Sequence, residues 1–473
     1  MSGPDADMRG WTAAQTAAAV TGGDVKALEV ACAALQSIEK LNPKVNAFTE
    51  VVSERALEEA GAVDDARAEG RHLPLAGVPY AVKNLYDIEG LTTRAGAKIN
   101  GENPAAVADA TLVRRLREAG AVLVGATHMG EYAYDFTGES AHDGICRNPH
   151  DTSRMTGGSS SGSAAAAAAG MVPLAMGSDT NGSIRVPASF CGLFGLKPTY
   201  GRLSRAGTYP FVGSLDHLGP LTRSAGDLAL IFDVLQGHDP LDPAQSSHPE
   251  IETHARLEEG IGQLRIAVAG GYFREKALPE ALNATDLVAS ALGAGREIDI
   301  PEAARARAAA YVITAAEGSS LHLKRIIERP GDFDPETRDR FLAGTMVPAV
   351  WVQQAQRFRS WFRDLFRKIF EKVDILLAPA TPFHALPSGT KTFTINGETM
   401  PARPNIGLFT QPISYIGLPA VTVPVWLEGA NLPIGVQVIA PAWREDLALR
   451  VAHHLEKTGV AAAPVAALAA SRG

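Results

Sequence analysis

Short runs of apolar residues, separated by stretches with helical character, are the feature of this sequence that most restricts its fold. Each run is apolar throughout rather than at alternate positions, which is typical of strands covered on both faces of a sheet. The expected strands are Pro79–Lys83, Ala121–Ala126, Leu264–Ala269, Asp374–Ala378, Ala420–Val425 and Ile434–Ile439. Helical segments at Thr111–Ala119 and Ser163–Ala169 lie between them. This alternation predicts an α/β fold in which helices cover both faces of a large, twisted, mixed and mostly parallel central sheet.

The region from about residue 301 to residue 372 departs from this alternation. Apolar side chains recur there every three or four residues, as in an amphipathic helix. They are Ala355, Phe358, Phe362, Leu365 and Ile369. We interpret the region as a helical excursion from the main body, and about residues 1–70 as an N-terminal helical segment. No long linker separates the expected strands, so residues 1–473 are expected to form a single domain.

The composition argues against several classes of protein. Of the 473 residues, 44 are Lys or Arg, 52 are Asp or Glu and 46% are hydrophobic, which is typical of a globular chain with a mild negative charge. Without a basic block, direct binding to nucleic acid is not expected. The three cysteines suit neither a disulfide framework nor a metal site, and no secretory signal or membrane span is recognisable. We therefore expect a cytoplasmic protein without a metal.

The stretch Met155–Ala169, "MTGGSSSGSAAAAAA", has three interpretations. A flexible Gly/Ser linker is one, although the run passes directly into alanines, which are the best helix formers. An anion site at a helix start is the second, although the Gly-Lys-Ser/Thr ending of a phosphate loop is missing. Nucleophilic catalysis is the third, because a serine hydroxyl becomes reactive beside a base.

A base for such a serine is available at the end of an expected strand. Histidine, the usual partner of serine, is absent from the stretch, and a neutral lysine can replace it. Burial disfavours the ammonium form and so lowers the pKa of a lysine. Lys83 closes the apolar segment "PYAVK" and would be partly desolvated there. We interpret His128, His142 and His217 as structural or pocket-lining residues rather than as acid–base groups.

Several motifs resemble the amidase signature family of serine amidohydrolases. Two segments carry most of the resemblance, "GGSSSGSAAAAAAG" at Gly157–Gly170 and "GSDTNGSIRVPASFCGLFGLKPT" at Gly177–Thr199. The further matching motifs are "AVKN" at Ala81–Asn84, "SLDHLGPLTRS" at Ser214–Ser224, "GLPAVTVPV" at Gly417–Val425 and "LPIGVQVIA" at Leu432–Ala440. The resemblance extends over about residues 77–449 and implies the amidase signature fold.

The resemblance implies a Ser–Ser–Lys triad that works without a cofactor. Ser183 would be the nucleophile and Lys83 the base. Ser159, joined to Gly158 by a cis peptide bond, would pass the proton between them. The acyl group of an amide would then be transferred to Ser183, and water would release it.

The resemblance also implies an oxyanion hole and residues that support the triad. The main-chain N–H groups that would bind the oxyanion belong to Thr180, Asn181, Gly182 and Ser183. Glycine is usual in the family at position 181, so Asn181 is a departure. Ser160 would hydrogen-bond Lys83, and Asp179 would pair with Arg185 to brace the turn.

Within the family, the sequence is similar to the branch of 1-carboxybiuret hydrolases, which release ammonia from urea-like amides in the breakdown of s-triazines such as cyanuric acid. The motifs that carry this likeness are "MGEYAYDFTGES" at Met129–Ser140, "RNPHD" at Arg147–Asp151 and "RPNIGLFTQPISYIGLPAV" at Arg403–Val421. It implies a small anionic amide as substrate. The candidate substrate-binding residues are Tyr132, Arg403, Thr410 and Gln411, with Arg403 as the fork for a carboxylate.

The likeness implies a partner as well, a small helical subunit within a homo- or hetero-oligomer. Three other functions stay open on the residues alone. The chain could be a general aliphatic, aryl or malonamate-type amidase, or the amidotransferase subunit of a tRNA-dependent complex. It could also be a scaffold that has kept the fold without activity, although the complete triad speaks against this.

Overall fold

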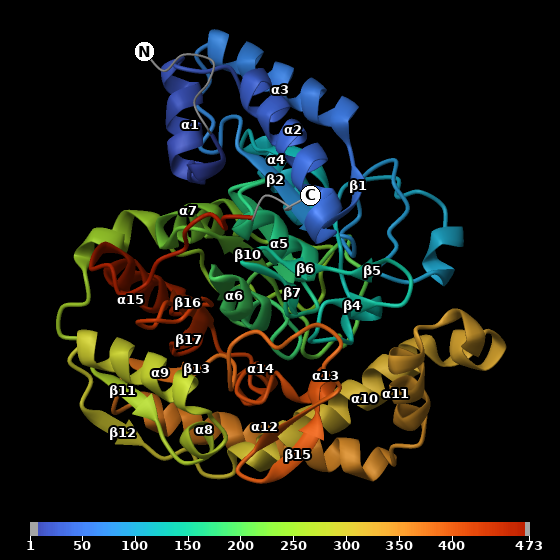
Figure 1. Cartoon of the computed structure of the whole chain (residues 1–473), viewed down its shortest axis with the longest axis vertical. Helices are drawn as coiled ribbons and strands as arrows, with labels where there is room; N and C mark the ends of the chain where they lie inside the picture. Colours follow the sequence, from blue (N-terminus) through green and yellow to red (C-terminus); the bar gives the residue numbers. More distant parts are fainter. Residues whose placement is uncertain (1–7, 469–473) are drawn as a thin grey trace.

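The computed structural model describes residues 8–468 of the chain (Figure 1). The helices are α1 (Ala13–Gly22), α2 (Ala27–Val45), α3 (Ser53–Ala68), α4 (Thr111–Glu118), α5 (Ser161–Ala168), α6 (Arg185–Cys191), α7 (Ala225–Leu235), α8 (Tyr272–Glu275), α9 (Pro279–Ala291), α10 (Ala303–Glu328), α11 (Pro335–Thr345), α12 (Ala349–Phe370), α13 (Ala402–Asn405), α14 (Gln411–Tyr415) and α15 (Glu445–Lys457). The strands of the central sheet are β1 (Phe48–Val51), β2 (Pro79–Lys83), β3 (Val122–Thr127), β8 (Leu174–Ser178), β9 (Phe194–Lys197), β10 (Leu218–Thr222), β11 (Ile266–Ala269), β12 (Arg296–Ile298), β13 (Ile375–Pro379), β16 (Ala420–Val425) and β17 (Ile434–Ile439). The strands of three small two-stranded sheets are β4 (Glu139–Ser140), β5 (Gly144–Ile145), β6 (Arg147–Asn148), β7 (Asp151–Met155), β14 (Thr392–Ile395) and β15 (Glu398–Pro401).

The central sheet is mixed, as predicted, and has the strand order β1-β3-β2-β8-β10-β9-β16-β17-β13-β11-β12. Its parallel pairs lie toward the two ends, where β2 runs parallel to β3 and β8, and β11 runs parallel to β12 and β13. The pairs between β8 and β13 are antiparallel. The antiparallel share is larger than expected, because short connections such as the one from β16 to β17 reverse the chain and permit only that pairing.

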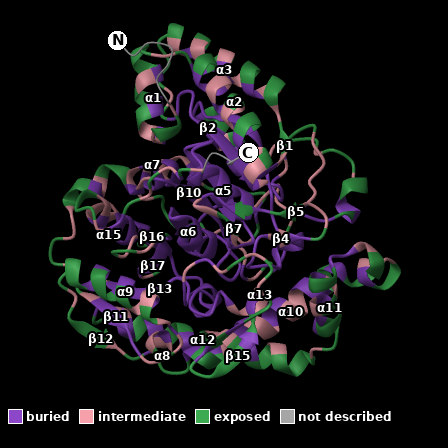
Figure 2. Cartoon of the chain, viewed as in Figure 1, coloured by how far each residue is buried: buried purple, intermediate pink, exposed green. Residues whose placement is uncertain are grey.

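The two faces of the sheet are covered by different helices, which explains why its strands are apolar throughout. Tyr80 and Val82 of β2 belong to a hydrophobic cluster shared with α4 and α7. Ala81, between them, belongs to a second cluster shared with α2, α3 and α5. Successive side chains of a strand point to opposite faces, so both faces here need apolar residues. Figure 2 shows the resulting core, with the buried residues gathered around the sheet and α5.

The two segments predicted to be helical contain the expected helices. In the N-terminal segment, α2 and α3 pack on each other and on β3. β1 also lies there and pairs with β3, so the purely helical prediction for about residues 1–70 missed an edge strand. The excursion consists of α10, α11 and α12, which pack together along the lower edge of Figure 1.

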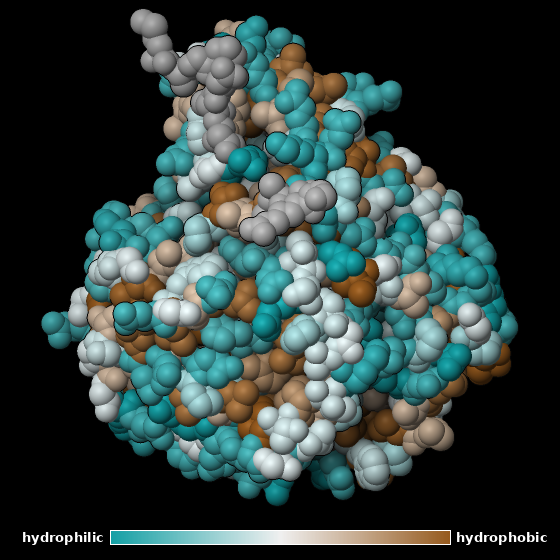
Figure 3. Space-filling view, in the orientation of Figure 1, coloured by the Kyte–Doolittle hydropathy of each residue, from teal (hydrophilic) through white to brown (hydrophobic). Residues whose placement is uncertain are grey.

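The surface carries the polarity expected of a globular domain. On the face in Figure 3, hydrophilic residues dominate and hydrophobic ones are interspersed among them. Among the helices of residues 8–468, none combines the length and the apolar character that crossing a bilayer requires.

Candidate active site

Two neighbouring parallel strands bring Lys83 to the centre of the molecule. Lys83 is the last residue of β2, and Ser178 is the last residue of β8, so both lie at the same edge of the sheet. Lys83 Nζ lies 2.8 Å from Ser178 Oγ and 2.7 Å from Ser159 Oγ. The side chain is fully buried. Its amine therefore has hydroxyl groups as direct partners, rather than a carboxylate that would fix it as an ammonium ion.

Burial gives this amine a pKa suited to a base. Desolvation lowers the pKa of Lys83 from 10.5 to about 7, although the negative charges of Asp179, Asp216 and Asp135 oppose the shift. Near neutral pH, about half of the molecules then carry the neutral amine. A base with a pKa close to the working pH accepts and returns a proton efficiently.

The glycine–serine stretch is buried and forms the turn that leads into α5, which excludes a flexible linker. The peptide bond Gly158–Ser159 is cis, as the family resemblance implied. In the described part of the chain, Ser160 makes no hydrogen bond to Lys83, which differs from the prediction. Its Oγ donates to the main-chain oxygen of Ser178 (3.1 Å) and accepts from the nitrogen of the same residue (3.2 Å). Because Ser160 is held by this main chain, the side chain of Ser178 takes the expected place beside the amine.

Ser183 lies in the turn between β8 and α6, next to the serine stretch. The N–H of Ser160 donates to the carbonyl oxygen of Ser183 (3.3 Å), which joins the two loops. The predicted oxyanion donors are the main-chain N–H groups of Thr180, Asn181, Gly182 and Ser183. Among residues 8–468, none of these four groups has an acceptor. They are thus available to an oxygen atom of a ligand at Ser183.

Gly182 and Thr410 set the shape of this loop. Gly182 has a φ of 138°, and a Cβ added there would lie 2.1 Å from Thr410 Oγ1. Such a position requires glycine. Thr410 Oγ1 also donates to the carbonyl oxygen of Asn181 (2.7 Å). The hydroxyl of Thr410, predicted to bind substrate, is therefore engaged in holding the oxyanion loop.

The predicted pair of Asp179 and Arg185 braces the same loop from inside. Both side chains are fully buried, with Nε 2.9 Å from Oδ2 and Nη2 2.9 Å from Oδ1. Burial alone would raise the pKa of Asp179, but the charge and hydrogen bonds of Arg185 outweigh it and hold the pKa below its ordinary value. At the other side of the turn, Asp216 accepts a hydrogen bond from Thr180 Oγ1 (2.6 Å).

A small cavity opens at Ser183 and contains residues that the sequence did not single out. Besides loop residues, its walls include Tyr311, Thr314, Arg340 and Gln411. The guanidinium of Arg340 lies over the ring of Tyr134, donates from Nη1 to the carbonyl oxygen of that residue (2.6 Å) and from Nη2 to Tyr311 Oη (3.0 Å). Its Nε is buried and has no partner among the described residues. Arg340 thus brings a positive charge to the wall of the cavity at Ser183.

The predicted substrate-binding residues divide into two groups. Gln411 does line the cavity at Ser183, and its Oε1 accepts from Arg307 Nε (2.7 Å). Tyr132 instead packs against His322 and does not line this cavity. Arg403 lies against Asp135, with Nη1 3.1 Å from Oδ1. The structure does not bring Arg403, predicted as the carboxylate fork, to the cavity at Ser183, where Arg340 stands instead.

The three histidines that could have competed with Lys83 are held by other groups. His128 is buried between Ser161 Oγ (2.9 Å) and the carbonyl oxygen of Gly144 (3.0 Å). His142 Nε2 lies 3.0 Å from a carboxylate oxygen of Glu131. His217 Nδ1 lies near two main-chain carbonyl oxygens, and burial keeps its pKa well below the ordinary value. Their contacts agree with the structural interpretation.

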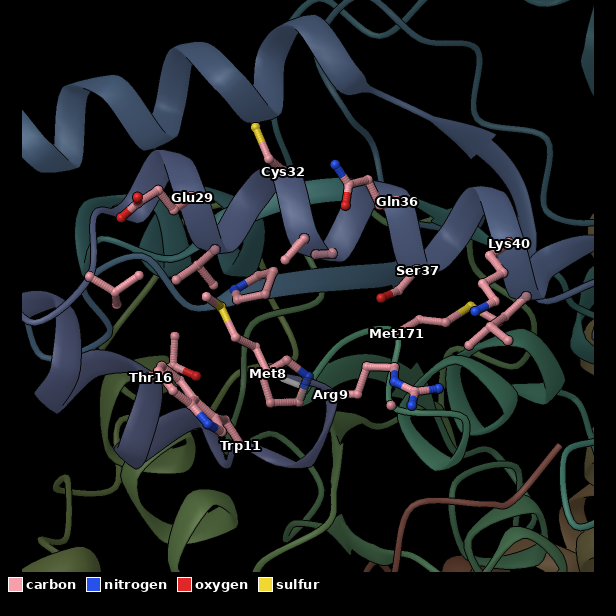
Figure 4. Close-up of a pocket in the computed structure, with 18 of the residues that line it drawn as sticks. Met8, Arg9, Trp11, Thr16, Glu29, Cys32, Gln36, Ser37, Lys40 and Met171 are labelled. Atoms are coloured by element: carbon pink, nitrogen blue, oxygen red, sulfur yellow. The ribbon is translucent and has the colours of Figure 1, made fainter. Parts of the chain in front are cut away.

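Two further cavities do not include Ser183 in their walls. One of about 210 Å³ reaches Ser178 and adjoins the cavity at Ser183, with which it shares Ala133, Thr180 and Phe211. The other, about 910 Å³, lies among α1, α2 and the segment after α5, and neither Lys83, Ser159 nor Ser183 lines it (Figure 4). In the described part of the chain, no group of three or more His, Cys, Asp or Glu side chains is placed to hold a metal ion.

Comparison with known proteins agrees with this geometry. The family model described as Amidase matches residues 29–449. The chain is 53% identical to AtzE, the 1-carboxybiuret hydrolase protein of Pseudomonas sp. (strain ADP), over 93% of this chain and 97% of that protein. It is 36% identical to a subunit of the glutamyl-tRNA(Gln) amidotransferase of Chromohalobacter salexigens, over 94% of this chain and 96% of that protein.

Solved structures give the same picture. An inhibitor-bound "vestigial protein complex" of an s-triazine catabolic enzyme superposes with a TM-score of 0.94 and 52% identity, over 96% of this chain and 99% of that chain. A 6-aminohexanoate cyclic dimer hydrolase with bound substrate superposes with a TM-score of 0.86 and 29% identity, over 97% of this chain and 99% of that chain.

Proposed function

The chain belongs to the amidase family, and we propose that it is an amidohydrolase that releases ammonia from 1-carboxybiuret or a closely similar urea-type amide in s-triazine degradation. The observation that carries the chemistry is the buried amine of Lys83, 2.7 Å from Ser159 Oγ and with its pKa lowered to about 7. The identity of 53% to a 1-carboxybiuret hydrolase supports the substrate class.

In the proposed reaction, the neutral amine of Lys83 accepts the proton of Ser159 as Ser159 takes the proton of Ser183. The Oγ of Ser183 forms a bond to the amide carbon, and the carbonyl oxygen becomes an oxyanion bound by the N–H groups of residues 180–183. Each such donor is worth roughly 3 kcal/mol in a dry site. The carbon–nitrogen bond then breaks, and the nitrogen leaves as ammonia with the proton returned from Lys83 through Ser159. Water attacks the acyl-enzyme by the same relay.

We assign binding of the substrate's carboxylate to Arg340. Its guanidinium is at the cavity wall, and the buried Nε has no protein acceptor among the described residues. A carboxylate of the substrate would supply that acceptor and neutralise the charge. Gln411 is a second candidate for substrate contact, because it lines the same cavity.

A screen of ammonia release tests the function and its alternatives. The purified chain is incubated with freshly prepared 1-carboxybiuret, biuret, malonamate and an aryl amide, without tRNA or ATP. Preference for the ureides supports the proposal, whereas preference for malonamate or the aryl amide would make it a general or malonamate-type amidase. Activity confined to a tRNA-dependent complex would make it an amidotransferase component, like the 36% identical relative.

The charge of Arg340 is tested with two matched variants. Arg340→Gln should weaken binding of 1-carboxybiuret selectively, with a roughly 10-fold or greater rise in KM relative to biuret, which has no carboxylate. Arg403 is paired with Asp135, so Arg403→Gln should leave the ratio of the two KM values unchanged. Equal changes for both substrates in Arg340→Gln would contradict the assignment.

We further propose that the protein is cytoplasmic and acts with a small helical partner subunit in a homo- or hetero-oligomer. The similar solved structure is described as a complex, which supports this expectation. Light scattering measures the molar mass of the purified chain, first alone and then after co-expression with small helical proteins encoded next to its gene. A monomer that is fully active alone would rule out a required partner.

A further inference from the structure

Asn181, in the wall of the cavity at Ser183, has a side-chain acceptor that no described residue uses. The residue is only 7% exposed and lines the cavity together with Ser183. Its Nδ2 donates to Thr314 Oγ1 on α10 (2.9 Å), while its Oδ1 is buried without a hydrogen-bond partner in the described chain. Leaving a buried acceptor unsatisfied is unfavourable, so such a group calls for an explanation.

The side chain is held in this orientation from two directions. Thr314 fixes the amide nitrogen, and Thr410 fixes the main chain through its bond to the carbonyl oxygen of Asn181 (2.7 Å). An anchored acceptor beside Ser183 suits a ligand group that donates a hydrogen bond, which in an amide or ureide substrate is an N–H. In the same cavity, Arg340 Nε is a buried donor without an acceptor in the described chain. The wall of this small cavity thus includes one residue with an unused acceptor and one with an unused donor.

The position of the cavity tells which N–H group of the substrate this is. Its walls include Asn181, Thr314 and Arg340 but neither Lys83 nor Ser159. The leaving nitrogen has to face those two residues, since it receives its proton from them. The group that meets Asn181 is therefore on the acyl side of the carbonyl carbon. Ordinary amides have carbon there, whereas ureides have N–H.

We propose that Asn181 is a specificity-determining residue that selects ureides over carbon amides by accepting a hydrogen bond from the acyl-side N–H of the substrate. This rests on the proposed function, because the hydrogen bond forms only with a urea-type substrate in the site. It assigns to the side chain of Asn181 a role separate from that of its main-chain N–H in the oxyanion hole.

Biuret and malonamide test this role, since they differ only by N–H in place of CH₂ between the two carbonyl groups. The quantity measured is the ratio of their kcat/KM values, which cancels any common loss from disturbance of the loop. Asn181→Gly should reduce the biuret:malonamide ratio about 10- to 100-fold. Asn181→Asp keeps an acceptor at the same position and should retain most of the ratio, even where its charge slows both substrates.

Thr314→Val gives a second measurement without a change in the oxyanion loop. It frees the amide of Asn181 to rotate, so the ratio should fall part of the way toward that of Asn181→Gly. An unchanged ratio in Asn181→Gly, in an enzyme that hydrolyses ureides, would overturn the role of Asn181 and leave the proposed function intact. Failure of the unaltered enzyme to hydrolyse any ureide, together with turnover of malonamide, would instead overturn the proposed function and the selectivity assigned to Asn181.

Discussion

The lowered pKa of Lys83 makes a quantitative prediction for the pH dependence of the reaction. In the proposed mechanism the neutral amine is the active form, and its pKa in the folded protein is about 7. The fraction of neutral amine is then about 9% at pH 6, about 50% at pH 7 and about 91% at pH 8. We expect kcat/KM to rise roughly tenfold between pH 6 and pH 8 and to level off above pH 8. A lysine at its ordinary pKa of 10.5 would instead give a rate that still rises tenfold per unit at pH 9.

The assay is ammonia release from biuret at substrate concentrations below KM, over the range of pH in which the protein keeps its circular dichroism spectrum. A solvent deuterium isotope effect identifies the conditions in which proton transfer limits the rate. Asp216→Asn serves as a matched perturbation, because the charge of Asp216 raises the pKa of Lys83 and its removal should move the acidic limb to lower pH. A rate independent of pH from 6 to 8, with proton transfer limiting, would refute Lys83 as the base.

Three further predictions concern substitutions in and behind the site. Lys83→Ala and Ser183→Ala should each abolish turnover, and Ser159→Ala should leave little. Because the three residues act as a unit, the double variants should lose hardly more activity than the single ones. Additive losses in kcat would contradict this. Gly182→Ala should lower kcat at least 100-fold, since its Cβ would lie 2.1 Å from a threonine oxygen and would displace the oxyanion donors; near-normal kcat in steady-state assays would show that the loop tolerates the shift. Ala166→Val, in the fully buried helix α5, should destabilise the fold by about 1–3 kcal/mol through overpacking; an unchanged midpoint in urea denaturation would show spare space around the helix.

The sequence predicted six strands of the central sheet and missed the edge strands β1 and β12 and the inner strands β8, β9 and β10. β2, β16 and β17 begin and end where the pattern placed them. β8 and β10 contain Gly177 and Gly219, which resemble turn residues when the sequence is read alone. In the sheet, a Cβ at Gly219 would lie 2.1 Å from the carbonyl oxygen of Leu196, so glycine there permits close strands rather than a turn. Only the pairing of strands reveals that role.

The site was predictable where a local motif carries it and unpredictable where distant segments meet. Recognisable motifs contain Lys83, Ser159 and Ser183. The distances between these residues depend on how the strands pair in the sheet, which the motifs do not show. Arg340 is one of three charged residues in "RDR" on α11, and nothing nearby in the sequence marks it as the one at the nucleophile. The contact of Ser178 with Lys83 was not predicted, because Ser178 ends β8 and this strand was not predicted either.

One consequence follows from where the walls of the nucleophile's cavity originate. The residues proposed to transfer protons come from residues 83 to 183, and Asn181 lies in the same stretch, whereas Arg340 reaches the cavity from α11. The two proposed contacts to the substrate, one to its acyl-side N–H and one to its carboxylate, are thus encoded in separate stretches of the gene. Grafting α11 from another amidase should change the preference for anionic amides, while the proposed selection of ureides and the titration of Lys83 stay as they are.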